Sequence, residues 1–251
     1  MFPLRDENPT ELIPFVTFAL ILANVAVWLF VQGAGSGQMF LESLCQYGVI
    51  PGEVTGSIPE GTTVSLGPGA TCRVGGLQTS SVLTSMFMHG SWMHLIGNMW
   101  FLWVFGNNIE DSMGHARYLV FYLLTGALAS AGHIVAEPGS AIPTVGASGA
   151  ISGIMGAYIV LYPNVRVLTF VIIRVVALPA WVLLAYWFFL QIMGSRAAAA
   201  GDGGGVAFWA HIGGFVAGVV LVKLFEKQKL VRAKRAGHVL TRDEMGRWDR
   251  W

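Results

Sequence analysis

Seven polar side chains stand inside stretches of sequence that are otherwise apolar enough for a lipid bilayer. They are His89, His94, Asn98, His133, Ser148, Ser152 and His211. Strongly polar groups at membrane depth are costly, so each is a candidate functional residue. A serine close to a histidine is the minimum of an activated nucleophile, and fixed N–H donors suit a developing oxyanion. We expect no Asp or Glu deep in these stretches, which argues against proton-relay pumping.

The candidate nucleophile lies in the stretch GASGAISG, residues 146–153. Gly146 and Gly149 leave space around the backbone of Ser148 for a substrate strand and for an exposed amide. Ser148 would carry out the attack, and its own N–H would contribute to the oxyanion hole. The alternative is that Ser148 only bonds back to its own helix.

A second motif, HLIGN, places His94 and Asn98 four residues apart. In a helix this spacing puts both side chains on one face, where they present N–H donors side by side. The pair suits an oxyanion hole together with the Ser148 amide. For the pair taken alone, hydrogen bonds to neighbouring helices are the more common role.

A third motif, AHIGGFVAG at 210–218, combines His211 with small residues at every fourth position. Its small face is Ala210, Gly214 and Gly218, and Gly149, Gly153 and Ala157 form a matching face near the serine. If these faces pack together, Ser148 and His211 meet near the outer ends of their helices, where His211 acts as general base and then general acid. Helix packing without chemistry is the alternative.

The elements that would position these residues are transmembrane helices. Of the 251 residues, 54 % are hydrophobic and only 12 % are charged, and the mean hydropathy is +0.61; a soluble domain carries about 25 % charged residues. A net charge of +1 without a basic stripe gives no indication of nucleic-acid binding. We therefore predict an all-α integral membrane protein with six spans. They cover 14–32, 87–106, 117–136, 146–163, 176–194 and 206–225, with 164–175 as an interfacial connection.

The charge distribution predicts the orientation. Between Lys223 and Trp251 there are nine Lys or Arg and four Asp or Glu. Because positive charge favours the cytoplasmic side, both termini and the connection at 107–116 are expected inside. The loops at 33–85, 137–145 and 195–205 are then outside. We expect a transmembrane domain over 1–226 and a basic cytoplasmic tail over 227–251.

The long outer loop, 33–85, contains both cysteines, Cys45 and Cys72. On the oxidising side of a membrane, two cysteines in one loop can pair. Two free thiols remain the alternative, because the sequence does not give the Cα separation that a disulfide needs.

Together, GASG, HLIGN and AHIGGFVAG resemble the motifs of the rhomboid intramembrane serine proteases, in the order and on the spans typical of that family. The stretch 106–126, with Glu110 and Gly114, resembles the family's connection between the second and third spans. The likeness covers roughly 85–223. It implies a six-helix bundle around a water-filled cavity that opens to the outside.

The resemblance also implies the roles of individual residues. It assigns a Ser148–His211 dyad, oxyanion donors from His94, Asn98 and the Ser148 amide, and a bordering position for His89. It implies no metal or cofactor, and transmembrane helices as substrates, cut near their outer ends where helix-breaking residues loosen them and a small residue precedes the bond. Two features that some members of the family carry are missing: a Trp-Arg pair in 33–85, and a tyrosine under the histidine, where Ser152 stands. What orients His211 is thus open.

Other functions remain as alternatives. An inactive relative that binds transmembrane helices as an adaptor or chaperone would not need Ser148 and His211. A transporter is disfavoured because no internal repeat is seen. A metal site formed by His89, His94 and His211 lacks a Cys or carboxylate ligand. We expect the bacterial cell (inner) membrane as the location, the lipid bilayer and transmembrane substrates as partners, and no nucleic acid.

Overall fold

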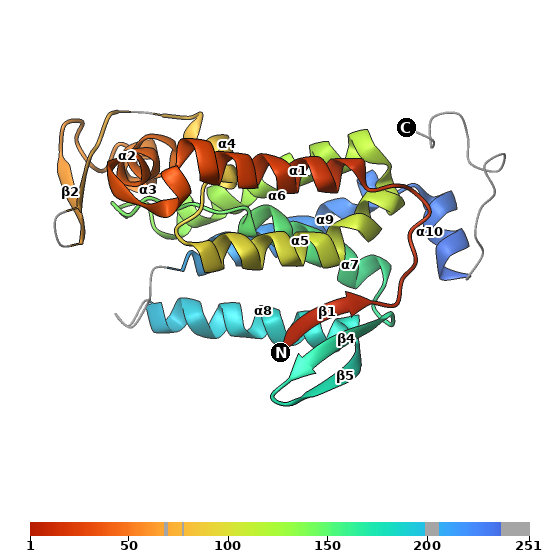
Figure 1. Ribbon diagram of the computed structural model, residues 1–251. Helices are drawn as coiled ribbons and strands as arrows, with labels where there is room; N and C mark the ends of the chain where they lie inside the picture. Colours follow the sequence, from red (N-terminus) through yellow and green to blue (C-terminus); the bar gives the residue numbers. More distant parts are fainter. Residues whose placement is uncertain (68–69, 77, 199–205, 237–251) are drawn as a thin grey trace.

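The computed structural model describes residues 1–67, 70–76, 78–198 and 206–236. Part of the predicted outer loop at 195–205 and most of the predicted basic tail, 237–251, lie outside the described residues. In the described part, six long helices lie side by side and the shorter elements gather at the ends and along one side (Figure 1).

The long helices are α1 (Phe15–Ala26, continued by a π-helical turn over Val27–Val31), α5 (Trp92–Met113), α6 (His115–Ala136), α7 (Ser148–Leu161), α8 (Ala180–Ala197) and α9 (Phe208–Phe225). The shorter helices are α2 (Gly37–Tyr47), α3 (Pro51–Val54), α4 (Ser81–Thr84) and α10 (Gln228–Arg235), with 3₁₀ turns at Gly33–Gly35 and Ser85–Phe87. The strands are β1 (Phe2–Asp6), β2 (Thr63–Gly67), β3 (Ala70–Arg73), β4 (Arg166–Val171) and β5 (Arg174–Pro179).

Helix α7 is the centre of the bundle. Its residues from Gly149 to Tyr158 are all buried, and the helix packs on α5, α6 and α9. Its sequence is rich in Gly and Ala, which lets three other helices approach it closely. The first residue of the most enclosed helix is therefore Ser148.

The helix boundaries agree with the predicted spans to within two residues except in the second and the fifth. In the fifth, residues 176–179 belong to β5, and the helix runs from Ala180 to Ala197. In the second, the helix starts at Trp92 rather than at 87 and continues to Met113, so most of the predicted connection at 107–116 is helical. A single residue, Gly114, separates α5 from α6; its φ of +76° is one that glycine adopts without strain. Glu110 and Asp111 are buried near the end of α5, outside the predicted span at 87–106 and within the stretch predicted as a connection.

Glu110 has a structural role that explains its burial. Its Oε1 accepts from the N–H of Val16 at 2.9 Å, and its Oε2 accepts from the N–H of Thr17 at 2.8 Å. These are N–H groups in the first turn of α1, which have no acceptor inside their own helix. A carboxylate there also suits the helix dipole. Glu110 thus caps α1 from a neighbouring helix.

Length and hydropathy separate the long helices into three groups. Among the described helices, α6 and α9 are long and apolar enough to cross a membrane by length and composition. Helix α1 with its π-helical extension, and α7, are apolar but shorter. Helices α5 and α8 are long, but they carry polar residues such as Asn98 and Gln191.

The prediction of an all-α chain is wrong in two places. Strands β1, β4 and β5 form an antiparallel sheet in that order, and β2 pairs with β3 in a hairpin. Residues 164–175, predicted as an interfacial connection, contain β4 and the start of β5. The stretch 167–178 is rich in β-branched residues, which favour strands. The N-terminal residues add β1, and the sheet lies beside α8 (Figure 1).

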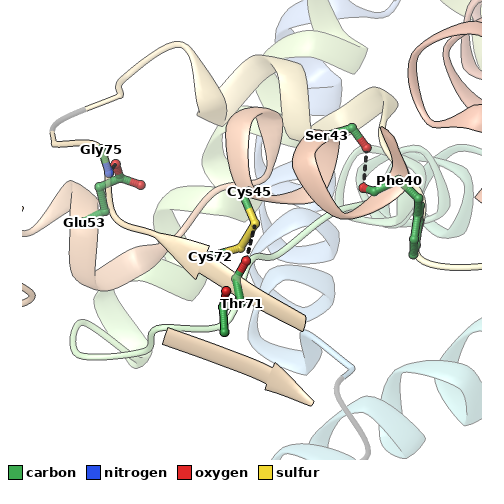
Figure 2. The surroundings of a disulfide bond; sticks show 7 residues. All are labelled: Phe40, Ser43, Cys45, Glu53, Thr71, Cys72 and Gly75. Atoms are coloured by element: carbon green, nitrogen blue, oxygen red, sulfur yellow. Dashed lines mark hydrogen bonds between the residues drawn. A yellow bond between two sulfur atoms is a disulfide. The ribbon is translucent and has the colours of Figure 1, made fainter. Parts of the chain in front are cut away.

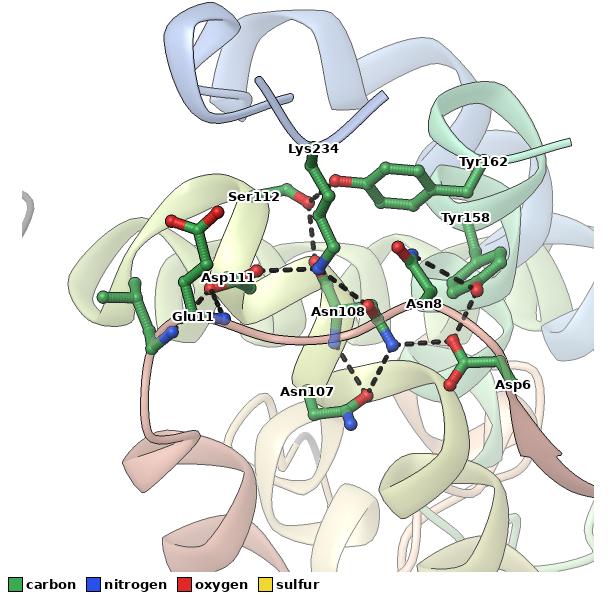
Figure 3. Close-up of polar contacts among 11 residues, drawn as sticks. Asp6, Asn8, Glu11, Asn107, Asn108, Asp111, Ser112, Tyr158, Tyr162 and Lys234 are labelled. Atoms are coloured by element: carbon green, nitrogen blue, oxygen red, sulfur yellow. Dashed lines mark hydrogen bonds and ion pairs between the residues drawn. The ribbon is translucent and has the colours of Figure 1, made fainter. Parts of the chain in front are cut away.

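Polar contacts join both ends of the described chain to the C-terminal end of α5 (Figure 3). Lys234 of α10 donates to Oδ1 of Asn108 at 2.8 Å and pairs with Oδ2 of Asp111 at 2.7 Å. Asn108 in turn donates to Oδ2 of Asp6 at 2.7 Å, and Tyr158 donates to the same oxygen. The predicted tail thus begins with a helix that packs against the bundle through Leu230, Val231 and Lys234.

Asp6 makes this network sensitive to pH. Burial raises the pKa of Asp6 to about 6, against the opposing effects of the Tyr158 hydroxyl and the Lys234 ammonium. The folded state therefore holds this proton more tightly than the unfolded chain, whose Asp has a pKa near 3.8. The stabilisation is fully present below about pH 3.8 and is lost as the pH rises through about 6.

We expect the Asp6→Asn variant to lose this pH dependence. In the wild type, the Asp6 contribution to the free energy of unfolding should fall by at most about 3 kcal/mol between about pH 4 and pH 7. Thermal unfolding in detergent micelles across that range measures it. Glu7→Gln, an exposed neighbour, is the control. The same pH dependence in Asp6→Asn and in the wild type would show that Asp6 is not the titrating group.

The predicted outer loop at 33–85 is a folded segment. A disulfide joins Cys45 of α2 to Cys72 of β3, with Cα atoms 5.4 Å apart, and Glu53 accepts from the N–H of Gly75 (Figure 2). A cross-link that closes a loop of 27 residues restricts the unfolded segment, an effect worth about 3–4 kcal/mol in the chain-entropy view. This segment lies at the end of the bundle opposite α10 (Figure 1).

Candidate active site

The loop before α7 is fixed by the outer segment. Val49 and Thr144 exchange two backbone hydrogen bonds, and the N–H of Gly146 donates to the carbonyl of Ser85 at 2.9 Å. Gly146 has a φ of +131°, which side-chain-bearing residues rarely adopt. The chain therefore enters α7 in a defined conformation, with Ser148 as the first helical residue.

Ser148 and His211 lie within hydrogen-bond distance of each other. Nε2 of His211 is 2.8 Å from Oγ of Ser148. The contact requires α7 and α9 to pack closely, and the glycines of α9 permit this. A Cβ at Gly214 would overlap the carbonyl oxygen of Gly149, and one at Gly218 would overlap that of Gly153. Small residues on α9 thus set the separation at which serine and histidine meet.

The two glycines of α7 differ from their expected role. A Cβ at Gly149 would lie 2.7 Å from Cβ of Ala129, and one at Gly153 would lie 2.5 Å from Cβ of Thr125. Both neighbours belong to α6. The missing side chains of Gly149 and Gly153 therefore make room for α6, whereas their carbonyl groups face α9.

His94 and Asn98 lie on α5, which starts with Ser91 accepting from the N–H of His94. A Cβ at Gly146 would lie 2.8 Å from Nε2 of His94 and 3.4 Å from Oγ of Ser148, so both atoms border this glycine. Asn98 is 8 % exposed, and its Nδ2 has no hydrogen-bond partner in the part of the chain that is described. It is thus a buried donor in need of an acceptor.

Two further histidines border this region. Gln32 holds the backbone of His89, since it accepts from its N–H at 2.8 Å and donates to its carbonyl at 2.7 Å. The His89 ring packs edge-on against that of His94, with centroids 5.1 Å apart. His133 meets Oγ1 of Thr144 at 2.9 Å, and no hydrogen bond between it and Ser148 is present. His133 therefore belongs to the support of the loop.

Gln191 of α8, which was not predicted as a site residue, contacts His211. Its Oε1 is 2.7 Å from Nδ1 of His211, on the side of the ring opposite Ser148. Trp187, one turn earlier, packs beside the same ring with centroids 5.8 Å apart. Ser152, by contrast, donates to the carbonyl of Ser148 at 2.6 Å. The partner of His211 comes from α8, where Gln191 is an amide in an otherwise apolar stretch.

One cavity lies beside Ser148, and a second cavity lies away from it. A pocket of about 20 Å³ lies beside Ser148 and is also lined by Ser85, Ser130 and Thr144. That volume suits about one water molecule with polar partners. A larger and more open cleft of about 570 Å³ lies between residues 4–10 and 103–107, away from the serine. The larger cleft is therefore not part of the site formed by Ser148 and His211.

The arrangement is suited to nucleophilic catalysis by a hydroxyl group. His211 contacts the oxygen of Ser148, Gln191 contacts the other nitrogen of His211, and Nε2 of His94 borders Gly146 together with Oγ of Ser148. No group of three or more His, Cys, Asp or Glu side chains suited to a metal ion gathers among the described residues.

Comparison with known proteins identifies a family model and several relatives that match this chain. The sequence model of the rhomboid domain matches residues 76–228. Mitochondrial Rhomboid protein 1 of Saccharomyces cerevisiae is 32 % identical over 165 residues, which cover 62 % of this chain and 46 % of that protein. Chloroplastic Rhomboid-like protein 11 of Arabidopsis thaliana is 29 % identical over 162 residues, covering 58 % and 52 %. The chain thus spans about half the length of these relatives.

Proposed function

The chain belongs to the rhomboid family, whose members are embedded in membranes, and from this premise we propose that it is an intramembrane serine endopeptidase. The observation that carries the proposal is the 2.8 Å contact between Nε2 of His211 and Oγ of Ser148. A histidine in this position can take the proton of the serine hydroxyl as the oxygen attacks a peptide carbonyl.

The proposed reaction passes through an acyl-enzyme. Attack by Ser148 forms a tetrahedral intermediate, and His211 then gives its proton to the leaving amine as the peptide bond breaks. Water, activated by the same histidine, hydrolyses the ester and restores the serine. The small polar pocket beside Ser148 supports this step, because its size fits a water molecule.

Three N–H donors would stabilise the oxyanion. The Ser148 amide is at the start of α7, where N–H groups have no acceptor in the helix. Nδ1 of His94 accepts from the N–H of Gly90 in a long contact of 3.4 Å, which leaves the proton on Nε2, the atom beside Gly146. Nδ2 of Asn98 is a buried donor that has no partner among the described residues. Donors held in place before the reaction are the most effective ones.

Replacing Asn98 by alanine tests this oxyanion hole. Loss of one donor lowers kcat by about 10²–10³ in a comparable site, so Asn98→Ala should cleave slowly but measurably. Asn107→Ala, on the same helix near its inner end, is the matched control. Rates are compared at saturating substrate in lipid vesicles. A normal rate in Asn98→Ala would remove Asn98 from the site.

The membrane arrangement is part of the proposal. We place α1, α5, α6, α7, α8 and α9 across the bilayer as a six-helix bundle with both termini in the cytoplasm, because the folded outer segment and α10 lie at opposite ends (Figure 1). The relatives do not support the bacterial inner membrane over an organelle membrane, since both named relatives are organellar.

The substrate class follows from the depth of the site. A peptide bond within a helix is shielded, so a substrate helix must unwind near its outer end before Ser148 can attack. Gly and Pro lower the cost of unwinding, by about 1 and 3 kcal/mol relative to Ala. We therefore propose transmembrane helices with such residues near the outer end, and a small residue before the cut bond, as substrates.

Cleavage of a reconstituted substrate tests the function. The full chain is placed in vesicles with a single-pass substrate that contains Gly-Pro near its outer end, and with a matched substrate that contains Leu-Leu there. We expect cleavage of the first and much slower cleavage of the second. A chain that binds both substrates and cuts neither would instead be an adaptor, and the protease proposal would be wrong.

A further inference from the structure

We propose that Gln191 is the third member of the catalytic group, a positioning residue that fixes the orientation and the tautomer of His211. This inference rests on the proposed protease function. It assigns a role to an α8 side chain that none of the three sequence motifs contains. It also answers how His211 is oriented when position 152 holds a serine that bonds to its own helix.

The orientation of the Gln191 amide is determined by its second contact. Its Nε2 donates to the backbone carbonyl of Trp187 at 3.2 Å. A carbonyl oxygen only accepts, so the amide cannot be turned over without placing two acceptors against each other. Oε1 must therefore be the atom that faces His211. With 8 % of the residue exposed, water offers little competition for either contact.

The amide orientation in turn determines the histidine tautomer. Oε1 of Gln191 is an acceptor, and it lies 2.7 Å from Nδ1 of His211. Nδ1 must therefore carry the proton in the neutral ring, which leaves the lone pair on Nε2. Nε2 is the atom 2.8 Å from Oγ of Ser148. The histidine is thus held in the form that can accept the proton of the serine.

Gln191 differs from the acidic residue of a Ser-His-Asp triad in one respect. A carboxylate both orients the ring and stabilises the imidazolium by its charge, whereas an amide orients the ring through a neutral acceptor. Trp187 restricts the ring further, because it packs against His211 at 40° between the ring planes and also contacts Phe215. The orientation of His211 in this chain therefore depends on Trp187 and Gln191, which lie one turn apart on α8.

Kinetics of three variants test this role. Gln191→Leu keeps the approximate size but removes the acceptor, and we expect kcat to fall by about 10–100-fold, with KM almost unchanged. Gln191→Glu keeps an acceptor, so it should retain more activity than Gln191→Leu. Because its charge favours the imidazolium, the acidic limb of its pH–rate profile should move to higher pH.

Ser195→Ala is the matched control. Ser195 is buried one turn further along α8, and its hydroxyl donates to the carbonyl of Ile192, without a contact to His211. We expect this variant to keep the kcat, KM and pH profile of the wild type. A Gln191→Leu variant with a rate within about twofold of the wild type and the same pH profile would overturn the proposal, while the protease function would stand.

A spectroscopic measurement does not depend on activity. Solid-state ¹⁵N NMR of histidine-labelled full-length protein in lipid distinguishes the Nδ1–H from the Nε2–H tautomer, and the His211→Asn variant assigns the signal. We expect His211 as Nδ1–H in the wild type and as a mixture in Gln191→Leu. An Nε2–H tautomer in the wild type would overturn the role of Gln191. A wild type that is inactive but shows the expected tautomer would refute the protease function alone.

Discussion

Cleavage of a transmembrane substrate is expected to fall to the background when Ser148 is replaced by alanine. In the proposed reaction, Oγ of Ser148 is the protein atom that forms the covalent bond with the carbonyl carbon of the substrate. Loss of a catalytic serine lowers kcat by a factor on the order of 10⁴–10⁶ in other serine hydrolases. The rate is measured in vesicles with the substrate that contains Gly-Pro, at equal amounts of folded protein.

The matched control for this variant is Ser152→Ala on the same helix. Ser152 is fully buried, and its hydroxyl donates to the carbonyl of Ser148. Loss of one such bond affects stability by about 1 kcal/mol, and we expect cleavage within a few-fold of the wild type. If Ser148→Ala cleaved at the wild-type rate, or if Ser152→Ala alone abolished cleavage, the nucleophile would be assigned to the wrong residue.

The second large effect is expected for His211→Ala, which removes the general base. Without Nε2 of His211, the serine hydroxyl has no acceptor for its proton, so kcat should fall by a similar factor. The two losses should not add, because serine and histidine act as one unit. The double variant, Ser148→Ala with His211→Ala, should thus be about as inactive as either single variant.

His133→Gln is the control for the loss of a histidine within the bundle. Its ring meets Thr144 in the loop before α7, and glutamine retains a polar group at that position. We expect this variant to cleave within about tenfold of the wild type, the loss due to looser positioning of the loop. Full activity in His211→Ala would mean that another group takes the serine proton.

Part of the fold could be predicted from the sequence. The apolar stretches located all six long helices, and they gave the bounds of α1 with its π-helical turn, α6, α7 and α9 to within two residues, because helix length and hydropathy are local properties. Strand β1 was missed because it pairs with β4 more than 160 residues later. Strands β4 and β5 form a local hairpin, and the β-branched residues of 167–178 were a signal for it that the prediction did not use. The end of α5 was missed because a charged residue such as Glu110 is typical of a loop. Its burial depends on hydrogen bonds to the first turn of α1, which the sequence does not reveal.

The candidate site was also predicted only in part. The motifs named Ser148, His94, Asn98 and His211, and the structure brings serine and histidine into contact. Gln191 was missed, although an amide inside the predicted span 176–194 is itself a signal by the cost of burying polar groups. Its partner could not be predicted, because no rule of spacing relates a residue of α8 to a histidine of α9. The contact between Gln191 and His211 depends on how α8 packs against α9.

The most direct test of the account is covalent labelling with a fluorophosphonate, which reacts with activated serine hydroxyls. The full-length protein in detergent is treated with the reagent, and the modified residue is identified by peptide mass spectrometry. We predict one adduct, on Ser148, that is absent in Ser148→Ala and strongly slowed in His211→Ala, while Ser152→Ala is labelled normally. A folded wild type that takes up no label, or takes it up at a serine other than Ser148, would contradict the central claim that Ser148 is activated by His211.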